Sequence, residues 1–227
     1  MSLHPLKRTD QNKAWTQGRK RKKVLIQPEY QLIISEGTDT EPNYFNAIAT
    51  IVNAKYPNKI NVSVEGIGDN TLSLLEKARR KVQNSPNDIR QVWIVYDTDD
   101  FPAEHINKTA LLCQQYSNDE IQYHAIWSNQ CIELWFLLHF GFYQADIHRK
   151  EYWPKLTEWI TSMGYGEYSK NRTDMYEILK PNMNYAIANA IRLEKINENR
   201  EPSASAPGTR VHELILHLKP YLDDTVS

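Results

Sequence analysis

The sequence has few cysteines and no long apolar run. Its 227 residues include two cysteines, Cys113 and Cys131, which do not form a CxxC pair. Two thiols cannot build a disulfide scaffold, so we expect a protein of a reducing compartment, the cytoplasm. No segment approaches the roughly 20 apolar residues that cross a membrane, and the first residues lack the apolar core of a secretion signal. These absences argue against a membrane-spanning protein and against a disulfide-stabilised secreted protein.

Several catalytic signatures are also missing. There is no GxSxG nucleophile motif, and His139 and His148 lack the spacing of a zinc-binding pair. The segment Gly66-Ile67-Gly68-Asp69-Asn70-Thr71 has two glycines of a dinucleotide-binding loop but not the third. We interpret it as a tight turn, with a phosphate contact through its backbone N–H groups as the alternative. A serine hydrolase, a zinc enzyme and a dinucleotide-dependent enzyme are therefore disfavoured.

Positive charge is concentrated near the N-terminus. The chain has a net charge of -1, but residues 1–23 carry eight basic residues and one acid, which gives this segment +7. We interpret residues 1–27 as a basic flexible arm, because a dense run of like charges repels itself and has no apolar periodicity. Nucleic-acid phosphate is its natural counterion, and a solubilising tail is the alternative. The candidate nucleic-acid contacts in the arm are Arg19, Lys20, Arg21, Lys22 and Lys23.

Strands and helices alternate through the first half of the chain. Short apolar runs predict strands, and apolar residues at helical spacing predict the helices between them. The run Val92-Trp93-Ile94-Val95-Tyr96 is apolar throughout, which is typical of a parallel strand buried on both faces. The pattern predicts an α/β fold with a mostly parallel sheet flanked by helices. The predicted strands span 31–35, 60–65, 92–96 and 121–127, and the predicted helices span 41–54, 72–82 and 103–116.

The second half of the chain has helical signals only. Residues 28–129 are therefore assigned to the sheet domain, and residues 130–227 to a C-terminal helical extension packed on it. The segment 201–208 is rich in serine, alanine and proline, which predicts a flexible loop. The predicted helices of the extension lie near 131–138, 151–162, 173–180, 182–198 and 210–221.

Acidic residues follow two of the most apolar predicted strands. Glu36 follows the first strand, and Asp97 and Asp99 follow the third. In a parallel sheet the carboxyl ends of neighbouring strands meet at one edge, where ligands collect. Three converging carboxylates would repel each other unless a cation lay between them, and an all-oxygen ligand set suits Mg²⁺ or Mn²⁺. The alternative is that these acids only make the loops polar.

Three segments resemble one protein family. The string EGTDTEPNYF begins at Glu36, DTD begins at Asp97, and SNQCIELWFLLHF begins at Ser128. These strings resemble the RloB family, whose members are Toprim-like proteins of bacterial restriction and anti-phage loci. The resemblance covers residues 20–222 and departs from the family pattern at Gln130, where proline is usual, and at 205–208. It implies a Toprim-like fold in which Glu36 is the general acid/base and Asp97 and Asp99 hold Mg²⁺.

Glu133 lies in an otherwise apolar predicted helix. A lone buried carboxylate costs several kcal/mol unless it is paired or protonated. Either Glu133 forms a salt bridge in the core with a C-terminal base, or it faces the carboxylate cluster and joins the catalytic residues. The resemblance favours the second arrangement.

A second surface combines basic and aromatic residues. Tyr165 and Tyr168 stand beside Lys170 and Arg172 in a glycine-containing stretch. Aromatic rings and basic side chains together can bind single-stranded nucleic acid, and a solvated loop is the alternative.

Taken with the resemblance, these patterns predict a Mg²⁺-dependent nuclease that cleaves DNA or RNA in anti-phage defence. The competing hypothesis is a catalytically silent Toprim-like subunit that binds a partner protein, such as a defence ATPase.

Overall fold

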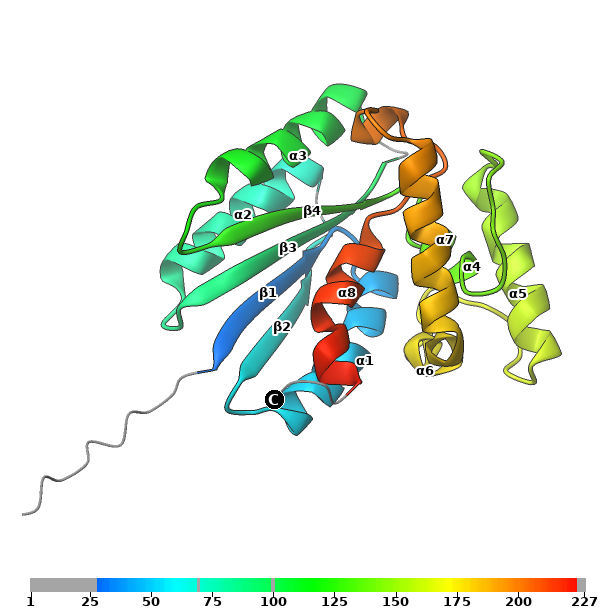
Figure 1. Ribbon diagram of the computed structural model, residues 1–227, viewed down its shortest axis with the longest axis horizontal. Coiled ribbons are helices and arrows are strands. Elements are labelled where there is room, and N and C mark those ends of the chain that lie inside the picture. Colours follow the sequence, from blue (N-terminus) through cyan, green and yellow to red (C-terminus); the bar gives the residue numbers. More distant parts are fainter. Residues whose placement is uncertain (1–27, 69, 99–100, 224–227) are drawn as a thin grey trace, which may run out of the picture.

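The computed structural model describes residues 28–68, 70–98 and 101–223. Within these residues, four parallel strands form one sheet with the order β2-β1-β3-β4 (Figure 1). The predicted α/β class with a parallel sheet flanked by helices is therefore confirmed, and the arrangement is Rossmann-like. The strands are β1 (Glu29–Ser35), β2 (Ile60–Gly66), β3 (Ile89–Asp97) and β4 (Gln122–Ser128).

Helices cover both faces of the sheet (Figure 1). Helix α1 (Thr40–Lys55) packs on one face, and helices α2 (Thr71–Asn84) and α3 (Ala103–Tyr116) pack on the other. After β1 the chain crosses to β2 on one side of the sheet, whereas after β3 it crosses to β4 on the other side. The connections after β1 and β3 therefore diverge, which opens a crevice at the carboxyl edge between these two strands.

The central strand β3 shows why its sequence is apolar throughout. Trp93 and Val95 pack in the same hydrophobic cluster as α1, whereas Ile94 and Tyr96 pack in the cluster beneath α2 and α3. All four side chains are buried, because successive residues of a strand point to opposite faces.

The C-terminal helices extend the core on the α1 face. Helix α8 (Val211–Leu222) contacts α1, α7 (Met183–Ile196) and β4, and its buried apolar residues share one hydrophobic cluster with the sheet, with α1 and with the other C-terminal helices. In the described residues no helix is both long enough and apolar enough to cross a membrane. The other elements are α4 (Glu133–Leu137), α5 (Tyr152–Ser162), α6 (Met175–Leu179), and the 3-10 turns η1 (Arg149–Glu151), η2 (Lys180–Asn182) and η3 (Pro202–Ala204).

The segment 201–208 is a loop, as predicted, but it contains the 3-10 turn η3 and is packed against the end of β4. Ser205 is buried, and the carbonyl oxygen of Gly208 accepts the N–H of Asn129 at 2.8 Å. Beyond the loop, Thr209 pairs with Ser128 in an antiparallel bridge. The segment is held because its backbone polar groups bond to the end of β4, which a composition rich in turn-forming residues does not reveal.

Candidate active site

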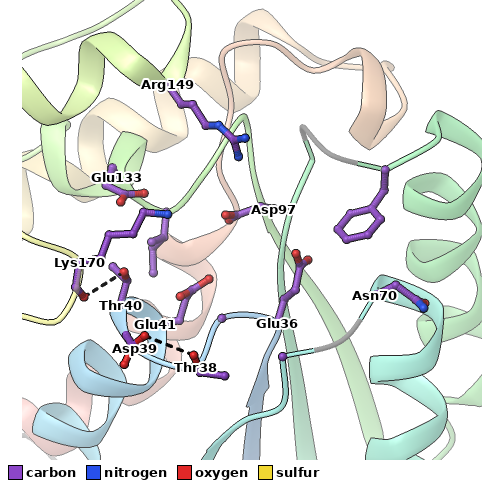
Figure 2. A pocket seen from close by; sticks show the side chains of 14 residues that line it. Glu36, Thr38, Asp39, Thr40, Glu41, Asn70, Asp97, Glu133, Arg149 and Lys170 are labelled. Carbon is purple, nitrogen blue, oxygen red and sulfur yellow. Dashed lines mark hydrogen bonds between the residues drawn. The ribbon is translucent and has the colours of Figure 1, made fainter.

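Two acidic residues meet at the carboxyl edge of the sheet. Ser35 of β1 is paired with Val95 of β3, and the backbone N–H of Glu36 donates to the carbonyl oxygen of Val95 at 3.0 Å. Asp97 ends β3 two residues further on. As Figure 2 shows, Glu36 and Asp97 line one pocket, which has a volume of about 550 Å³. The parallel strands therefore bring these two residues into the same pocket, at the end of the sheet that their sequence positions predicted.

The walls of this pocket come from both halves of the chain. One wall is formed by the loop between β1 and α1, and another by the turn that precedes α2. Phe101, which precedes α3, lines a further side. The C-terminal extension supplies another wall, so that Lys170 lies across the pocket from Asn70 and Arg149 extends its guanidinium inward (Figure 2). The lining residues are Glu36, Gly37, Thr38, Asp39, Thr40, Glu41, Gly68, Asn70, Asp97, Phe101, Ile132, Glu133, Arg149 and Lys170.

Glu41 is a buried acid of the pocket that the sequence analysis did not identify. It lies in the first turn of α1 and is 5% exposed. Burial raises the pKa of Glu41, and the nearby charge of Glu133 adds to the rise, whereas Lys170 opposes it. A Cβ atom on Gly37 would collide with the carboxylate of Glu41. The glycine after Glu36 therefore makes room for a second acid at the mouth of β1. The sequence signal for Glu41 was its place in the EGTDTEPNYF string.

Glu133 belongs to the pocket wall. Its side chain is almost fully buried, and its Oε1 accepts hydrogen bonds from Trp153 Nε1 at 3.1 Å and from the Tyr168 hydroxyl at 2.8 Å. Glu133 lines the same pocket as Glu36 and Asp97, which fits the second of the two arrangements considered from sequence. Its part in catalysis stays a prediction. Burial raises the pKa of Tyr168, and the charge of Glu133 raises it further, so this hydroxyl keeps its proton and remains a donor.

Arg149 is a further residue of the pocket that sequence reasoning missed. The side-chain oxygen of Gln130 accepts the backbone N–H of Arg149 at 2.8 Å, which holds the turn η1 against the segment before α4. Residues 139–150 have no helical or strand periodicity, so nothing in the sequence indicated that this arginine faces the acids. Only the packing of η1 brings it there.

One family model accounts for most of the chain. A model of the RloB-like protein family matches residues 31–218. The chain belongs to the RloB-like family. No curated protein and no solved structure matches it. The matched range of this RloB-like chain includes Glu36 and Asp97 on the sheet and also the walls that the C-terminal extension contributes.

The predicted basic and aromatic surface of the RloB-like chain is divided by the structure. Lys170 lines the pocket, as Figure 2 shows. Arg172 instead closes its own loop: its guanidinium bonds both carboxylate oxygens of Asp174, at 2.8 and 2.6 Å, and the carbonyl oxygens of Tyr165 and Glu167, each at 2.8 Å. The guanidinium lowers the pKa of Asp174. Arg172 therefore has a structural task that its neighbour Lys170 does not share.

Two of the three predicted metal ligands, Glu36 and Asp97, lie in the described part of the chain. Asp99 lies outside the described residues, as does the basic run 19–23. Among the residues that are described, no group of three or more histidine, cysteine, aspartate or glutamate side chains is placed to hold a metal ion. Glu36 and Asp97 do supply oxygen donors in a polar pocket. Mg²⁺ binds through one or two carboxylates and keeps several waters, so these two residues fit it.

Proposed function

We propose that this RloB-like chain is a divalent-metal-dependent nuclease that hydrolyses phosphodiester bonds of DNA or RNA. The observation that carries the proposal is the convergence of Glu36 and Asp97 from adjacent strand ends in one pocket, with Arg149 on its wall. Hydrolysis of a phosphodiester by this route uses acidic side chains that hold a metal cation and a positively charged side chain that binds the phosphate. A Toprim-like assignment and a role in anti-phage defence rest on the family resemblance and form part of the proposal.

Glu36 and Asp97, with Asp99, would hold Mg²⁺ or Mn²⁺. When bound, the cation would neutralise phosphate charge and lower the pKa of a water molecule. The two described ligands lie at the ends of strands that pair along their length, so their backbones are fixed before any ligand binds. A rigid frame of this kind limits the reorganisation that binding requires.

The side chains of the pocket would contribute in three further ways: positive charge, proton transfer and positioning. Arg149 and Lys170 carry the positive charge that a phosphodiester needs in an acidic pocket. Glu36 is the proton carrier in the proposed reaction, because a carboxylate beside the scissile phosphate can accept a proton from water. Glu133 orients Trp153 and Tyr168 through its two hydrogen bonds and so acts as a positioning residue.

The first test compares a substitution in the site with a matched substitution of an acid elsewhere. Purified protein is incubated with plasmid, single-stranded DNA and tRNA in Mg²⁺, Mn²⁺ or EDTA. We expect cleavage that EDTA abolishes and that Asp97→Asn abolishes in Mg²⁺, while melting temperatures show that the fold is intact. Asp119→Asn is the control, because Asp119 is exposed and lies beside Gln122 at the amino-terminal end of the strands, opposite the pocket. It should leave cleavage unchanged.

A second comparison separates metal binding from proton transfer. Glu36→Gln keeps the size of the side chain and loses its basicity, so it should lower kcat by about 10²–10⁴-fold. If Glu36 is mainly the proton carrier, this variant retains Mg²⁺-dependent stabilisation better than Asp97→Asn does. If neither substitution alters cleavage or phage restriction, and disruption of the C-terminal helices does alter restriction, the partner-binding subunit replaces the nuclease as the better account.

A further inference from the structure

An exposed tryptophan stands beside the pocket and is tied to its wall. Trp153 is the second residue of α5, and its indole N–H donates to Glu133 Oε1 at 3.1 Å. The Nζ of Lys170, a pocket-lining residue, lies 5.1 Å from the centre of the indole ring. Trp153 nevertheless remains 38% exposed. Building on the nuclease proposed above, we propose that Trp153 and Lys170 form a subsite for one unpaired nucleotide, so that the substrate is a single-stranded segment of nucleic acid.

The subsite is held in place before a substrate arrives. Glu133, which receives the indole N–H, also accepts the Tyr168 hydroxyl at 2.8 Å, and the backbone N–H of Tyr168 donates to Thr157 Oγ1 of α5 at 3.2 Å. The carbonyl oxygen of Lys170 accepts the hydroxyl of Thr40 at 3.1 Å, which attaches the loop to the start of α1. The indole ring is therefore fixed at one edge, while the long side chain of Lys170 can move between the ring and a phosphate.

Stacking on this ring requires a base that has left its own stack. Inside a duplex both faces of each base are covered by neighbours, so only an unpaired or flipped base can lie against an indole. Aromatic stacking is tolerant of base identity, because every base has a π face. The subsite therefore selects for strand state and not for sequence.

The basic side chains of the pocket would position the sugar-phosphate backbone of the bound nucleic-acid strand. Arg149 and Lys170 are the basic side chains that line the pocket within the described residues, and Figure 2 shows both on the side of the C-terminal extension. A strand whose base stacks on Trp153 has its adjoining phosphate within the field of Lys170. A phosphate further along the same strand can then be bound by Arg149, which lines the same pocket as Asp97, where cleavage is proposed.

The first test measures binding without chemistry. Fluorescence anisotropy follows dye-labelled oligothymidylate, oligouridylate and a mixed-sequence duplex binding to the full chain in EDTA, at a salt concentration that suppresses binding by exposed basic residues. We expect Trp153→Ala to weaken binding of both single strands by about 10-fold. Trp153→Phe keeps an aromatic face and should lose less than about 3-fold. The two single strands show whether the subsite prefers DNA or RNA.

Trp159→Ala is the matched control. Trp159 lies on the same helix, is 41% exposed, and stacks on Phe140 with ring centres 5.4 Å apart. Its removal should leave single-strand affinity unchanged. If Trp159→Ala weakens binding as much as Trp153→Ala does, or if Trp153→Phe loses as much as Trp153→Ala, the stacking subsite is overturned. The second result would show that only the hydrogen bond to Glu133 matters.

Cleavage distinguishes failure of this inference from failure of the proposed nuclease. With Mg²⁺, the ratio of kcat/KM for single-stranded over duplex substrate should fall in Trp153→Ala and stay unchanged in Trp159→Ala. If the wild-type protein cleaves duplex as well as single strands and Trp153→Ala leaves the ratio unaltered, the inference fails and the nuclease stands. If the protein cleaves no polynucleotide yet loses single-strand affinity in Trp153→Ala, the nuclease fails and the subsite stands.

Discussion

Gly37 and Glu41 show how one missing side chain shapes the pocket. Gly37 follows Glu36, and a Cβ atom at this position would meet the carboxylate of Glu41. The neighbouring Gly66 is similarly crowded, since its Cβ atom would lie 2.5 Å from the carbonyl oxygen of Gly37. Both glycines are needed because two loops and a buried acid approach each other at the ends of β1 and β2. The arrangement of the acids in the site therefore depends on two glycines, which have no side-chain functional group.

Gly37→Ala should displace Glu41 and disturb the pocket. Overpacking of a tight site lowers the free energy of unfolding by roughly 1–3 kcal/mol, and the cleavage rate should fall because the pocket is distorted. The double variant Gly37→Ala/Glu41→Ala removes the carboxylate that the new methyl group meets, so it should recover part of the lost stability. Chemical denaturation measures this. Gly141→Ala is the control, because its new methyl group would be in ordinary contact with Tyr143 at 3.4 Å. Equal destabilisation by Gly37→Ala and Gly141→Ala would contradict the argument.

Helix α8 is fastened to the sheet by a cluster of rings and amides. The ring of Trp93 on β3 stacks on His124 of β4 with centres 3.9 Å apart, and His217 of α8 lies 4.9 Å from the same ring. Gln31 bonds His217 at 2.7 Å, and Gln91 bonds His124 at 2.7 Å. Each of these amides and rings has a hydrogen-bond partner, so the helix docks on a polar patch within an apolar core.

Acid should loosen this contact. Burial lowers the pKa of His124 to about 4, and the charge of His217 contributes. Burial also lowers the pKa of His217, while Glu29 opposes the shift. A histidine whose folded pKa is depressed stabilises the fold above its unfolded pKa of about 6.5, and this stabilisation is lost as the pH falls toward 4. The free energy of unfolding should therefore decrease over this range.

The histidine contribution can be isolated by substitution. His124→Phe keeps a ring against Trp93 and cannot take up a proton. Its free energy of unfolding should decrease less between pH 6.5 and pH 4 than that of the wild type, as followed by denaturant titrations at each pH. His139 and His212 also have lowered pKa values, so part of the acid sensitivity should remain. Identical pH profiles for the two proteins would show that His124 does not contribute.

The complete molecule has a strongly uneven distribution of charge. Residues 1–23 carry +7 in a chain whose net charge is -1, while the pocket is lined by Glu36, Asp39, Glu41, Asp97 and Glu133. An acidic pocket repels a polyanion at long range, so a basic segment elsewhere on the chain can bring nucleic acid close despite that repulsion. Binding and cleavage would then depend on different parts of the sequence.

Deletion of residues 1–23 should weaken nucleic-acid binding at low salt and flatten its salt dependence. For every phosphate that the shortened chain no longer neutralises, the slope of log K against log salt falls by about 0.7–0.9. A chain in which residues 1–23 are shuffled keeps their charge and should behave like the wild type. Anisotropy titrations at several salt concentrations measure both. An unchanged slope after deletion would identify the segment as a solubilising tail.

The parallel sheet and the meeting of Glu36 with Asp97 could be predicted from local pattern alone. Strand periodicity, and the rule that parallel strands end at one edge, place two residues 61 positions apart in one pocket. Arg149, the Trp153–Glu133 bond and the structural role of Arg172 could not be predicted in this way. Their positions depend on hydrogen bonds between loops and helices that are distant in sequence, and such contacts leave no periodic trace in the chain. Tertiary packing therefore decided which residues surround the acids, because it alone brings the C-terminal extension to the edge of the sheet.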